Sequence, residues 1–297
     1  MKYSYFLGCQ VPARVNYCEL AVRRVTKALG IELIDLQGAG CCGCYLRSVD
    51  FRVTLGLASR ILALADKQGL DLVLLCNSCY STLTETTDFL KENPELRTET
   101  NELLAPQDLE YTGRTKVKDI IQVFYDDYGL QKIKSKVTRS FKGLKVAVQY
   151  GCHLLRPSKS TKFDNPEAPH ILDDLVEVTE AESIYWPLKL WCCGFPSLPM
   201  NREMGMMLAR NKFRAAKDAG ADFMVTTCPS CQISFDILQP SIAKHYGEKY
   251  DLPVLYYPQL LGLAMNMDYK ELGLHLNRVS TEPILRFIKE KRIEATA

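Results

Sequence analysis

The sequence predicts an α/β protein made of two pseudo-symmetric copies of one unit, each with a parallel sheet. Two observations predict this fold. Ten of the twelve cysteines in the 297-residue chain fall into two matched sets of five, which indicates an internal duplication. In both copies, short apolar runs alternate with amphipathic runs, as in parallel sheets whose strands are joined by right-handed crossover helices. We expect a first domain over residues 1–140 and a second over residues 141–297.

The predicted strands and helices follow the same order in the two copies. β-branched and aromatic runs mark the strands, and each long amphipathic run ends near a glycine, as helices commonly do. For the first copy we predict strand 2–7, helix 11–29, strand 32–36, helix 50–68 and strand 71–75. For the second copy we predict strand 144–150, helix 166–177, strand 183–186, helix 200–219 and strand 222–227.

Two segments lie outside the repeated pattern. Residues 91–141 are predicted to form a polar helical connector, and residues 256–297 a helical carboxyl-terminal extension. Because crossover connections make the strands of each copy parallel, motifs that follow the strands should meet at one edge of each sheet. Open α/β sheets usually bind their ligands at that edge.

The repeated motif is a single cysteine, an adjacent pair followed by glycine, and a Cys-x-x-Cys turn. Counterparts in the two copies lie 143 residues apart for the single cysteine and 151 or 152 residues apart for the other four. The first set is Cys9, Cys41, Cys42, Cys76 and Cys79, and the second is Cys152, Cys192, Cys193, Cys228 and Cys231.

Composition and charge argue against several classes of function. The chain is 47% hydrophobic and 24% charged, as globular proteins are, and its formal net charge of +2 gives no reason to expect a nucleic-acid partner. Residues 1–8 do not form a signal-peptide pattern, and every long apolar window is broken by charge. We therefore expect a cytoplasmic protein without direct membrane insertion, whose cysteines stay reduced and bind metal or carry out redox chemistry.

Five cysteines per copy fit an iron–sulfur cluster better than a zinc ion. Zinc takes four tetrahedral ligands and could still bind within one copy, but side chains of an adjacent pair diverge and more easily hold two metals of one cluster. Gly43 and Gly194, which follow the pairs, would let the backbone turn sharply beside the cluster. Ordinary clusters use four cysteines, so the fifth either supports an atypical cluster or stays free as a nucleophile.

Other redox cofactors lack their motifs. Neither Cys-x-x-Cys is followed by histidine, as covalent haem attachment requires, and the Cys-x2-Cys-x2-Cys-x3-Cys run of ferredoxins is absent. No Gly-x-Gly-x-x-Gly follows a predicted strand, so a bound dinucleotide has no support. We therefore expect the electrons to come from a protein donor.

The doubled motif resembles the signature of the B-type subunits of heterodisulfide reductase (HdrB-like proteins), a family with two cysteine-rich CCG domains. The resemblance covers nearly the whole chain, including residues 150–153 (Tyr-Gly-Cys-His) and 258–265. It implies two Rossmann-like CCG domains with a helical connector and a helical extension. It also implies two noncubane 4Fe-4S clusters, each held by all five cysteines of one set; one cluster plus one zinc ion is the alternative.

The resemblance further implies a reaction and its partners. A disulfide substrate, either the heterodisulfide of coenzyme M and coenzyme B or a related disulfide, would lie between the two clusters and be split homolytically, each thiolate being taken up by one cluster iron. Single electrons would come through a ferredoxin-like iron–sulfur subunit (HdrC-type) from a flavin-containing subunit (HdrA-type). His153, beside a ligand cysteine, is the expected proton donor or substrate contact, although it could simply pack there.

Residues near the motifs are weaker candidates. Segments 44–47 and 195–199, which follow the two pairs, are bulkier than in the methanogen members and should wall the substrate cleft. Cys18 is predicted to be a buried hydrophobe, and Cys44, which has no counterpart, could touch the first cluster. Five cations that follow ligand cysteines could hold an anionic group of the substrate: Arg47, Arg156, Lys159, Lys162 and Arg202.

Two alternative functions remain open from the sequence. The chain could be an electron-transfer subunit of a succinate or fumarate reductase type of complex, or belong to a related sulfur-oxidising complex. In the first alternative the clusters would pass electrons to a quinone or flavin partner and bind no disulfide.

Overall fold

The computed structural model describes residues 1–296, so residue 297, the end of the expected extension, lies outside the described residues. Its first half contains, in order, β1 (Lys2–Phe6), α1 (Gln10–Arg14), α2 (Asn16–Ala28), β2 (Glu32–Asp35), η1 (Cys44–Leu46), α3 (Phe51–Gln68), β3 (Leu72–Leu74) and α4 (Asn77–Glu92). The segment that follows contains α5 (Pro94–Leu104), η2 (Ala105–Gln107), β4 (Val117–Asp119), α6 (Ile120–Gln122), the π-helical η3 (Val123–Gly129) and α7 (Leu130–Lys134).

The second half repeats this order. It contains β5 (Lys145–Gln149), α8 (Cys152–Leu155), α9 (Ser158–Thr161), α10 (Ile171–Glu177), β6 (Glu182–Ser183), η4 (Phe195–Ser197), α11 (Arg202–Asp218), β7 (Phe223–Thr226) and α12 (Pro229–Gln232). It continues with the π-helical η5 (Ile233–Ile237), α13 (Gln239–Tyr246), β8 (Val254–Tyr256), α14 (Tyr257–Ala264), η6 (Leu274–Leu276) and α15 (Glu282–Thr296).

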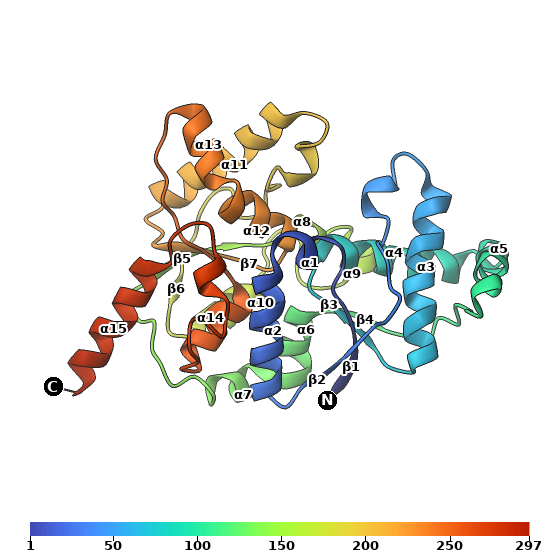
Figure 1. Ribbon diagram of the computed structural model, residues 1–297, viewed down its shortest axis with the longest axis horizontal. Helices are drawn as coiled ribbons and strands as arrows, with labels where there is room; N and C mark the ends of the chain where they lie inside the picture. Colours follow the sequence, from blue (N-terminus) through green and yellow to red (C-terminus); the bar gives the residue numbers. More distant parts are fainter. Residues whose placement is uncertain (297) are drawn as a thin grey trace.

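Two four-stranded sheets form the centre of the molecule, and every strand pair in them is parallel. The strand orders are β2-β1-β3-β4 and β6-β5-β7-β8, so the two sheets have the same topology. The predicted class, a duplicated α/β unit with parallel sheets, is confirmed. Figure 1 shows α3 and α11, the long helices that follow the two cysteine pairs, standing on opposite sides of the central strands.

The structure differs from the sequence predictions in several elements. Helix α4 was not predicted, and the helix predicted over residues 166–177 begins only at Ile171. The connector contains strand β4, and β8 begins just before the expected extension, so each sheet has a fourth strand that we did not predict. Both strands have three residues, too few for an alternating pattern, and they form because β3 and β7 offer a free edge beside them. The helix predicted over residues 11–29 is divided at Val15, whose φ of −138° is not helical.

The two halves pack tightly through elements next to the cysteine motifs. α4 of the first half lies against α8 and α9 of the second, and α14 lies against α2. Gly151 sits so close to Asn77 that an added Cβ would come within 1.9 Å of the Asn77 Oδ1 atom. This contact fixes the end of β5 against the beginning of α4.

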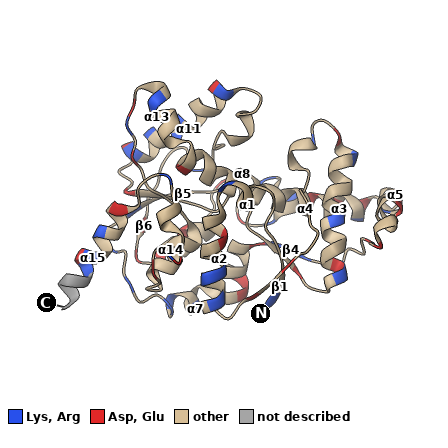
Figure 2. Cartoon of the chain, viewed as in Figure 1, with Lys and Arg blue, Asp and Glu red and all other residues tan. Residues whose placement is uncertain are grey.

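Charged residues are distributed over the surface without forming a face of one sign. Figure 2 shows lysine and arginine interleaved with aspartate and glutamate along the outer helices. Within residues 1–296, every helix is too short or too polar to cross a bilayer.

Asp66, near the end of α3, ties this helix to the loop that leads into β4. Its Oδ2 atom accepts bonds from the backbone N–H groups of Thr112 and Gly113, and Oδ1 accepts from Thr115. Burial alone would raise the pKa of Asp66, but the bonds from Thr115 and Thr112 outweigh it and lower the pKa below its usual 3.8. Because the folded pKa is below the unfolded value, the stabilisation is complete above that value and is lost as the pH falls through the folded pKa.

We expect Asp66→Asn to lower the free energy of unfolding by about 1–3 kcal/mol at neutral pH, because buried N–H donors lose their acceptor. Urea unfolding from pH 7 to pH 3 should show the wild type losing this advantage in acid while the variant changes less. The matched control is Asp108→Asn, which removes an exposed carboxylate of the same region. An equal effect of the two substitutions would contradict the role of Asp66.

Candidate functional site

All ten motif cysteines lie beyond the carboxyl ends of strands, as the sequence predicts. Cys9 follows β1 and Cys76 follows β3, while Cys152 and Cys228 follow the equivalent strands β5 and β7. Because the sheets are parallel, each set of five is brought to one edge. The two edges face each other where the halves of the molecule meet.

Each Cys-x-x-Cys turn starts a helix. Cys76 is the N-cap residue of α4, and the backbone N–H of Cys79 bonds to its sulfur. Cys228 is the N-cap residue of α12, and Cys231 bonds to its sulfur in the same way. The unpaired N–H groups of a helix N-terminus favour negative charge, so both turns are suited to thiolates or to an anionic cluster.

A glycine follows each adjacent pair, and its positive φ is a backbone conformation that other residues rarely adopt. Gly43 has φ of 79° and Gly194 has φ of 83°, and each backbone N–H lies 3.4 Å from the sulfur of the first cysteine of its pair, Cys41 or Cys192. An added Cβ on Gly194 would lie 2.2 Å from the carbonyl oxygen of Gly205. The predicted sharp turns are present, and they bend the backbone around the sulfurs.

The ten thiols form one continuous chain of side-chain contacts that runs through both halves. The order along this chain is Cys9, Cys41, Cys42, Cys79, Cys76, Cys228, Cys231, Cys193, Cys192 and Cys152. The sequence of motif positions is therefore palindromic, as a pseudo-twofold axis requires. The two halves of the chain join at a single contact, between Cys76 and Cys228.

The pKa shifts of the adjacent cysteine pairs follow the same pattern in the two sets. The pKa of Cys41 is lowered to about 2 because the thiol of Cys42 donates to its sulfur, and the pKa of Cys192 is lowered to about 2 because Cys152 donates to it. The same type of bond raises the pKa of Cys42 and of Cys193 to about 12. Packing these sulfurs together resists full deprotonation, and a bound cation would remove that cost.

At the junction, the first cysteines of the two Cys-x-x-Cys turns have pKa values shifted in opposite directions. The pKa of Cys228 is lowered well below its usual value because the thiols of Cys231 and Cys76 donate to it, whereas the pKa of Cys76 is raised by its bond to Cys228. Both sulfurs are buried. The electrostatic coupling of the two sets is therefore concentrated at this contact.

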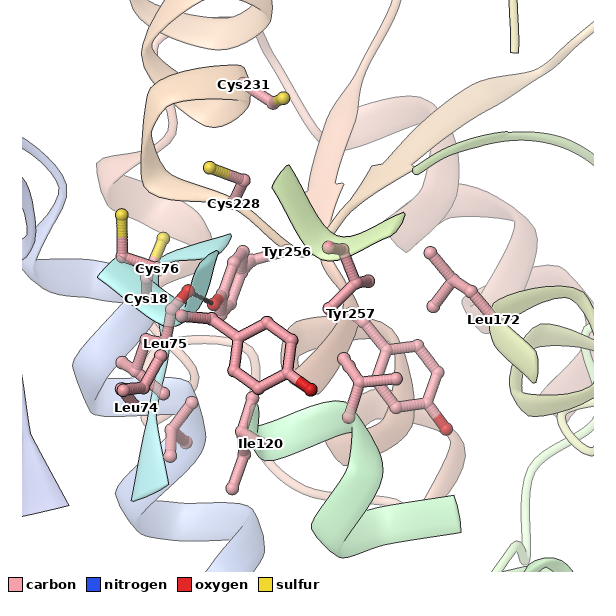
Figure 3. Packing of buried hydrophobic residues seen from close by; sticks show 14 of the residues in the cluster. Cys18, Leu74, Leu75, Cys76, Ile120, Leu172, Cys228, Cys231, Tyr256 and Tyr257 are labelled. Atoms are coloured by element: carbon pink, nitrogen blue, oxygen red, sulfur yellow. Dashed lines mark hydrogen bonds between the residues drawn. The ribbon is translucent and has the colours of Figure 1, made fainter. Parts of the chain in front are cut away.

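A single hydroxyl group holds the backbone on both sides of the junction. The hydroxyl oxygen of Tyr256 lies 2.7 Å from the carbonyl oxygen of Leu75 and 3.1 Å from that of Thr227, the residues that precede Cys76 and Cys228. Figure 3 shows Tyr256 close to Leu75, beside Cys76 and Cys228. Tyr256 is completely buried, so these contacts are shielded from water.

Asn77 makes a second polar connection across the junction. Its Oδ1 atom accepts a bond of 3.3 Å from the Thr227 hydroxyl, and its Nδ2 atom donates to Asp119 at 2.8 Å. Asp119 is fully buried, and burial raises its pKa to about 7. Asn77 thus links the two Cys-x-x-Cys turns to Asp119 at the end of β4.

The segments that follow the two pairs meet across the halves of the molecule. The Tyr45 hydroxyl lies 3.3 Å from the Ser230 hydroxyl, and the rings of Tyr45 and Phe195 are 6.4 Å apart in an edge-to-face arrangement. Cys44 is held by the hydroxyls of Thr82 and Ser78 on α4.

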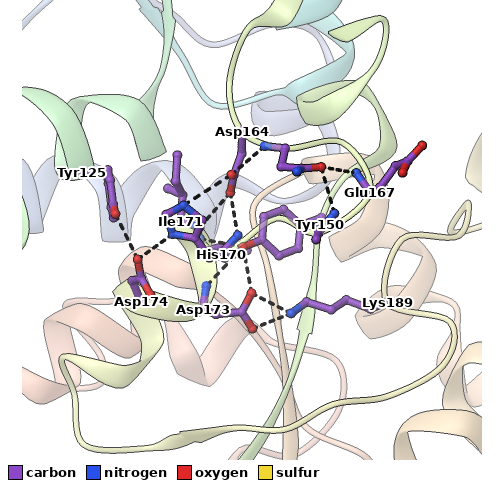
Figure 4. Close-up of polar contacts among 12 residues, drawn as sticks. Tyr125, Tyr150, Asp164, Glu167, His170, Ile171, Asp173, Asp174 and Lys189 are labelled. Carbon is purple, nitrogen blue, oxygen red and sulfur yellow. Dashed lines mark hydrogen bonds and ion pairs between the residues drawn. The ribbon is translucent and has the colours of Figure 1, made fainter.

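A cavity of about 880 Å³ opens at the outer end of the second set. Cys152 and Cys192 lie in its wall, and Trp191, which is 60% exposed, and Tyr185, which is 85% exposed, also line it. The loop that carries these aromatic side chains is anchored by Lys189, whose Nζ atom lies 2.6 Å from both carboxylate oxygens of Asp173 (Figure 4).

The other residues singled out from the sequence are placed as follows. The Nδ1 atom of His153 lies 2.8 Å from the Ser81 hydroxyl on α4, so the imidazole ring bridges the two halves. Cys18 is completely buried in the apolar core, as predicted.

Of the five candidate cations, Arg156 alone lines the cavity beside the second set. The others lie elsewhere: Arg47 pairs with Glu85 at 2.5 Å, Lys159 pairs with Glu92 at 3.4 Å, Lys162 is exposed in a left-handed turn, and Arg202 lies in a separate hollow near Arg14.

Three residues near the sulfurs were not found from the sequence: Asn77, Lys212 and Tyr256. Asn77 lies inside the first Cys-x-x-Cys and could have been noticed because its counterpart is Pro229, which has no side-chain donor. Tyr256 and Lys212 are distant from every motif in the sequence, and only the packing of β8 and α11 brings them to the site.

The donor set fits an iron–sulfur cluster. Sulfur ligands, helix N-termini and tightly turned glycines surround each set, and Gly8 leaves room for the Cys79 sulfur, which an added Cβ would approach to 3.2 Å. Over the described residues, no group of three or more His, Cys, Asp or Glu side chains converges on one point as a single ion would require. Iron–sulfur clusters extend over several metals, so their ligands can be spread along a chain of contacts.

Comparison with known proteins places the chain among iron–sulfur redox subunits. The profile of the cysteine-rich CCG domain matches residues 3–84 and 146–236, which are more than half of the chain. The B subunit of the ferredoxin/F(420)H(2)-dependent CoB-CoM heterodisulfide reductase of Methanosarcina acetivorans is 36% identical, over 97% of both chains.

Two other similarities bear on function and fold. The 8-methylmenaquinol:fumarate reductase membrane anchor subunit of Wolinella succinogenes is 31% identical over 93% of this chain and 96% of its own. A crystal structure of a hypothetical protein from Helicobacter pylori superposes with a TM-score of 0.76 at 17% identity, over 94% of this chain and 52% of that one, which supports the fold alone.

We expect Tyr256→Phe to lower the free energy of unfolding of the metal-free protein by about 1–3 kcal/mol, because the buried carbonyls of Leu75 and Thr227 lose a donor. The control is Tyr257→Phe, which removes one bond, to the Leu175 carbonyl, away from the junction. Denaturant titrations of both variants test this. If Tyr256→Phe lowers the free energy of unfolding no more than Tyr257→Phe does, the Tyr256 hydroxyl contributes no more than one ordinary hydrogen bond.

Proposed function

Because the chain belongs to the HdrB-like family of heterodisulfide reductase subunits, with two cysteine-rich CCG domains, we propose that it cleaves a disulfide reductively at two clusters. In coarser terms it is an iron–sulfur oxidoreductase subunit of a multisubunit complex. The proposal concerns the number and type of clusters, the residues that hold them, the substrate and the partner subunits.

In this proposal each set of five cysteines holds one noncubane 4Fe-4S cluster. Cys9, Cys41, Cys42, Cys76 and Cys79 hold the first, and Cys152, Cys192, Cys193, Cys228 and Cys231 hold the second. The observation that carries the proposal is the continuous chain of ten thiols joined at Cys76 and Cys228. Two cofactors bound along this chain would be neighbours, as a reaction that uses both requires.

The substrate would be a disulfide of the CoM-S-S-CoB type or a related one, and its reduction to two thiols takes up two electrons and two protons. The clusters, when bound, would supply the electrons one at a time. The chain itself would supply shape and protons. Tyr45 and Phe195 would bound the substrate on one side, and His153, oriented by Ser81, would deliver a proton to a departing sulfur.

The electrons would come from a ferredoxin-like HdrC-type subunit, itself supplied by a flavin-containing HdrA-type subunit. Cys9 and Cys41 are exposed in the isolated chain, so the first set is open to a protein donor. A donor that docks over these two residues would shorten the path for electron transfer to the sulfurs.

A second candidate function is electron transfer without disulfide chemistry. The similarity to a fumarate reductase subunit of Wolinella succinogenes favours it. In that case a thiol or disulfide ligand would leave the spectra of the clusters unchanged, whereas a disulfide-cleaving site would respond to such a ligand.

Anaerobic reconstitution should give about eight irons per chain if two four-iron clusters bind. Cys193→Ala should reduce the iron content by about half and abolish disulfide reduction, because the second set then lacks one of its five ligands and loses its cluster. Iron analysis and electron paramagnetic resonance (EPR) spectra measure both effects.

The matched control is Cys18→Ala, which removes a buried cysteine outside the two sets and should leave the iron content unchanged. Zinc with little iron in the wild type would overturn the two-cluster proposal. One cluster with one zinc ion would replace it by the mixed-site alternative.

His153→Gln should slow disulfide reduction by about 10²-fold or more without loss of iron, because an acid that donates a proton in the transition state commonly contributes that much. Ser81→Ala should have a smaller effect, since it removes the partner that orients the ring. Turnover with an artificial electron donor at several pH values measures these effects. An unchanged rate and pH profile in His153→Gln would assign the histidine a packing role only.

A further inference from the structure

Lys212 on α11 is a buried cation beside the second set of cysteines. Its side chain is 1% exposed. The Nζ atom donates to the carbonyl oxygens of Leu188 and Trp191, the latter at 2.9 Å, and lies 4.7 Å from the centre of the Trp186 ring. All three partners belong to the loop that leads directly into Cys192 and Cys193.

The partners that hold the ammonium group are neutral, so its charge must be balanced by something else. Burial lowers the pKa of Lys212 to about 8, and negative charge on four cysteines of the second set acts in the opposite direction. The four are Cys231, Cys193, Cys192 and Cys152. Among them, Cys192 directly follows the Trp191 carbonyl that accepts from the ammonium, and its own pKa is lowered. Its thiolate is therefore the counter-charge of the lysine, and a buried pair of this kind is weakly screened by salt.

In the first half of the molecule, the equivalent helix position holds an uncharged side chain. Aligning α3 and α11 on their N-cap residues, Asp50 and Asn201, places Ile61 at the position of Lys212. Ile61 is equally buried, at 1% exposure. The loop before the first pair is held instead by Arg60, which donates to the Gly38 carbonyl at 2.5 Å from the outer side of the helix.

The two loops also differ in bulk. The first reads Leu-Gln-Gly-Ala-Gly before its pair, and the second reads Trp-Pro-Leu-Lys-Leu-Trp. Two carbonyl oxygens of the second loop, those of Leu188 and Trp191, accept from the ammonium. The two sets of cysteines are therefore alike, but at this helix position the second half has a buried cation and the first half has Ile61.

We propose that Lys212 is an electrostatic positioning residue of the second cluster, which anchors the loop before Cys192 and makes this cluster easier to reduce than the first. This inference rests on the proposed function, because it presupposes two clusters. A fixed cation in a site that excludes water stabilises an added electron, so the potential of the nearby cluster rises. Electrons that enter at either cluster would then favour the second.

Lys212→Gln tests the proposal, because glutamine keeps an N–H donor for the loop carbonyls and removes the charge. EPR-monitored redox titration of the reconstituted full chain should show the midpoint potential of the second cluster shifted to a lower value, with the first unchanged. The signals are assigned by comparison with Cys193→Ala, which retains only the first cluster. The matched control is Arg60→Gln, which removes the cation from the equivalent loop and should shift neither potential.

Unchanged potentials in Lys212→Gln at full iron content would overturn the proposal. If Lys212→Gln binds only half of the iron, Lys212→Arg decides, since it restores the charge. Full iron and a second-cluster potential close to that of the wild type would support the proposal, whereas half iron in this variant too would show that the lysine only builds the loop. Failure of the wild type to bind two clusters would instead refute the proposed function, so the two failures are distinguishable.

Discussion

The arrangement of the whole molecule depends on the contact between the two Cys-x-x-Cys turns. Cys76 and Cys228 touch because the Tyr256 hydroxyl lies between the carbonyls of Leu75 and Thr227, and because Asn77 fills the space that Gly151 leaves open. These groups are buried, and the Leu75 carbonyl and the Thr227 hydroxyl would lose their partners in the other half if the halves separated. Unpaired buried polar groups are costly, so the junction is held at one distance rather than a range of distances.

The helices that pack across the junction carry the same constraint outward. α4 begins at the first Cys-x-x-Cys turn and lies against α8, which begins at Cys152, and against α9. His153, at the start of α8, meets Ser81 on α4 for this reason. Residues from both halves therefore surround the place where two cofactors would approach each other, and neither half contains a complete site by itself.

The pseudo-symmetry holds for the sulfurs and fails for their surroundings. The order of contacts among the ten thiols is the same when read from either end, yet the second set has an aromatic loop, a cavity of about 880 Å³ and a buried lysine beside it, and the lysine is replaced by Ile61 in the first half. Cys9 and Cys41 of the first set are exposed, whereas Cys152 and Cys192 are partly covered. A duplicated sequence thus forms two sets of cysteines with different access to solvent and different charged surroundings.

The sequence by itself determined the repeated α/β unit and the position of all ten cysteines at strand ends, because strand periodicity and the spacing of Cys-x-x-Cys and Cys-Cys-Gly are local properties. It did not determine β4 and β8, which have three residues each and form only against an existing sheet edge. Nor could it place Tyr256 and Lys212 beside the sulfurs. Their roles depend on contacts between residues far apart in the chain, and only tertiary packing, which buries a hydroxyl at the junction and an ammonium under one loop, decides those contacts.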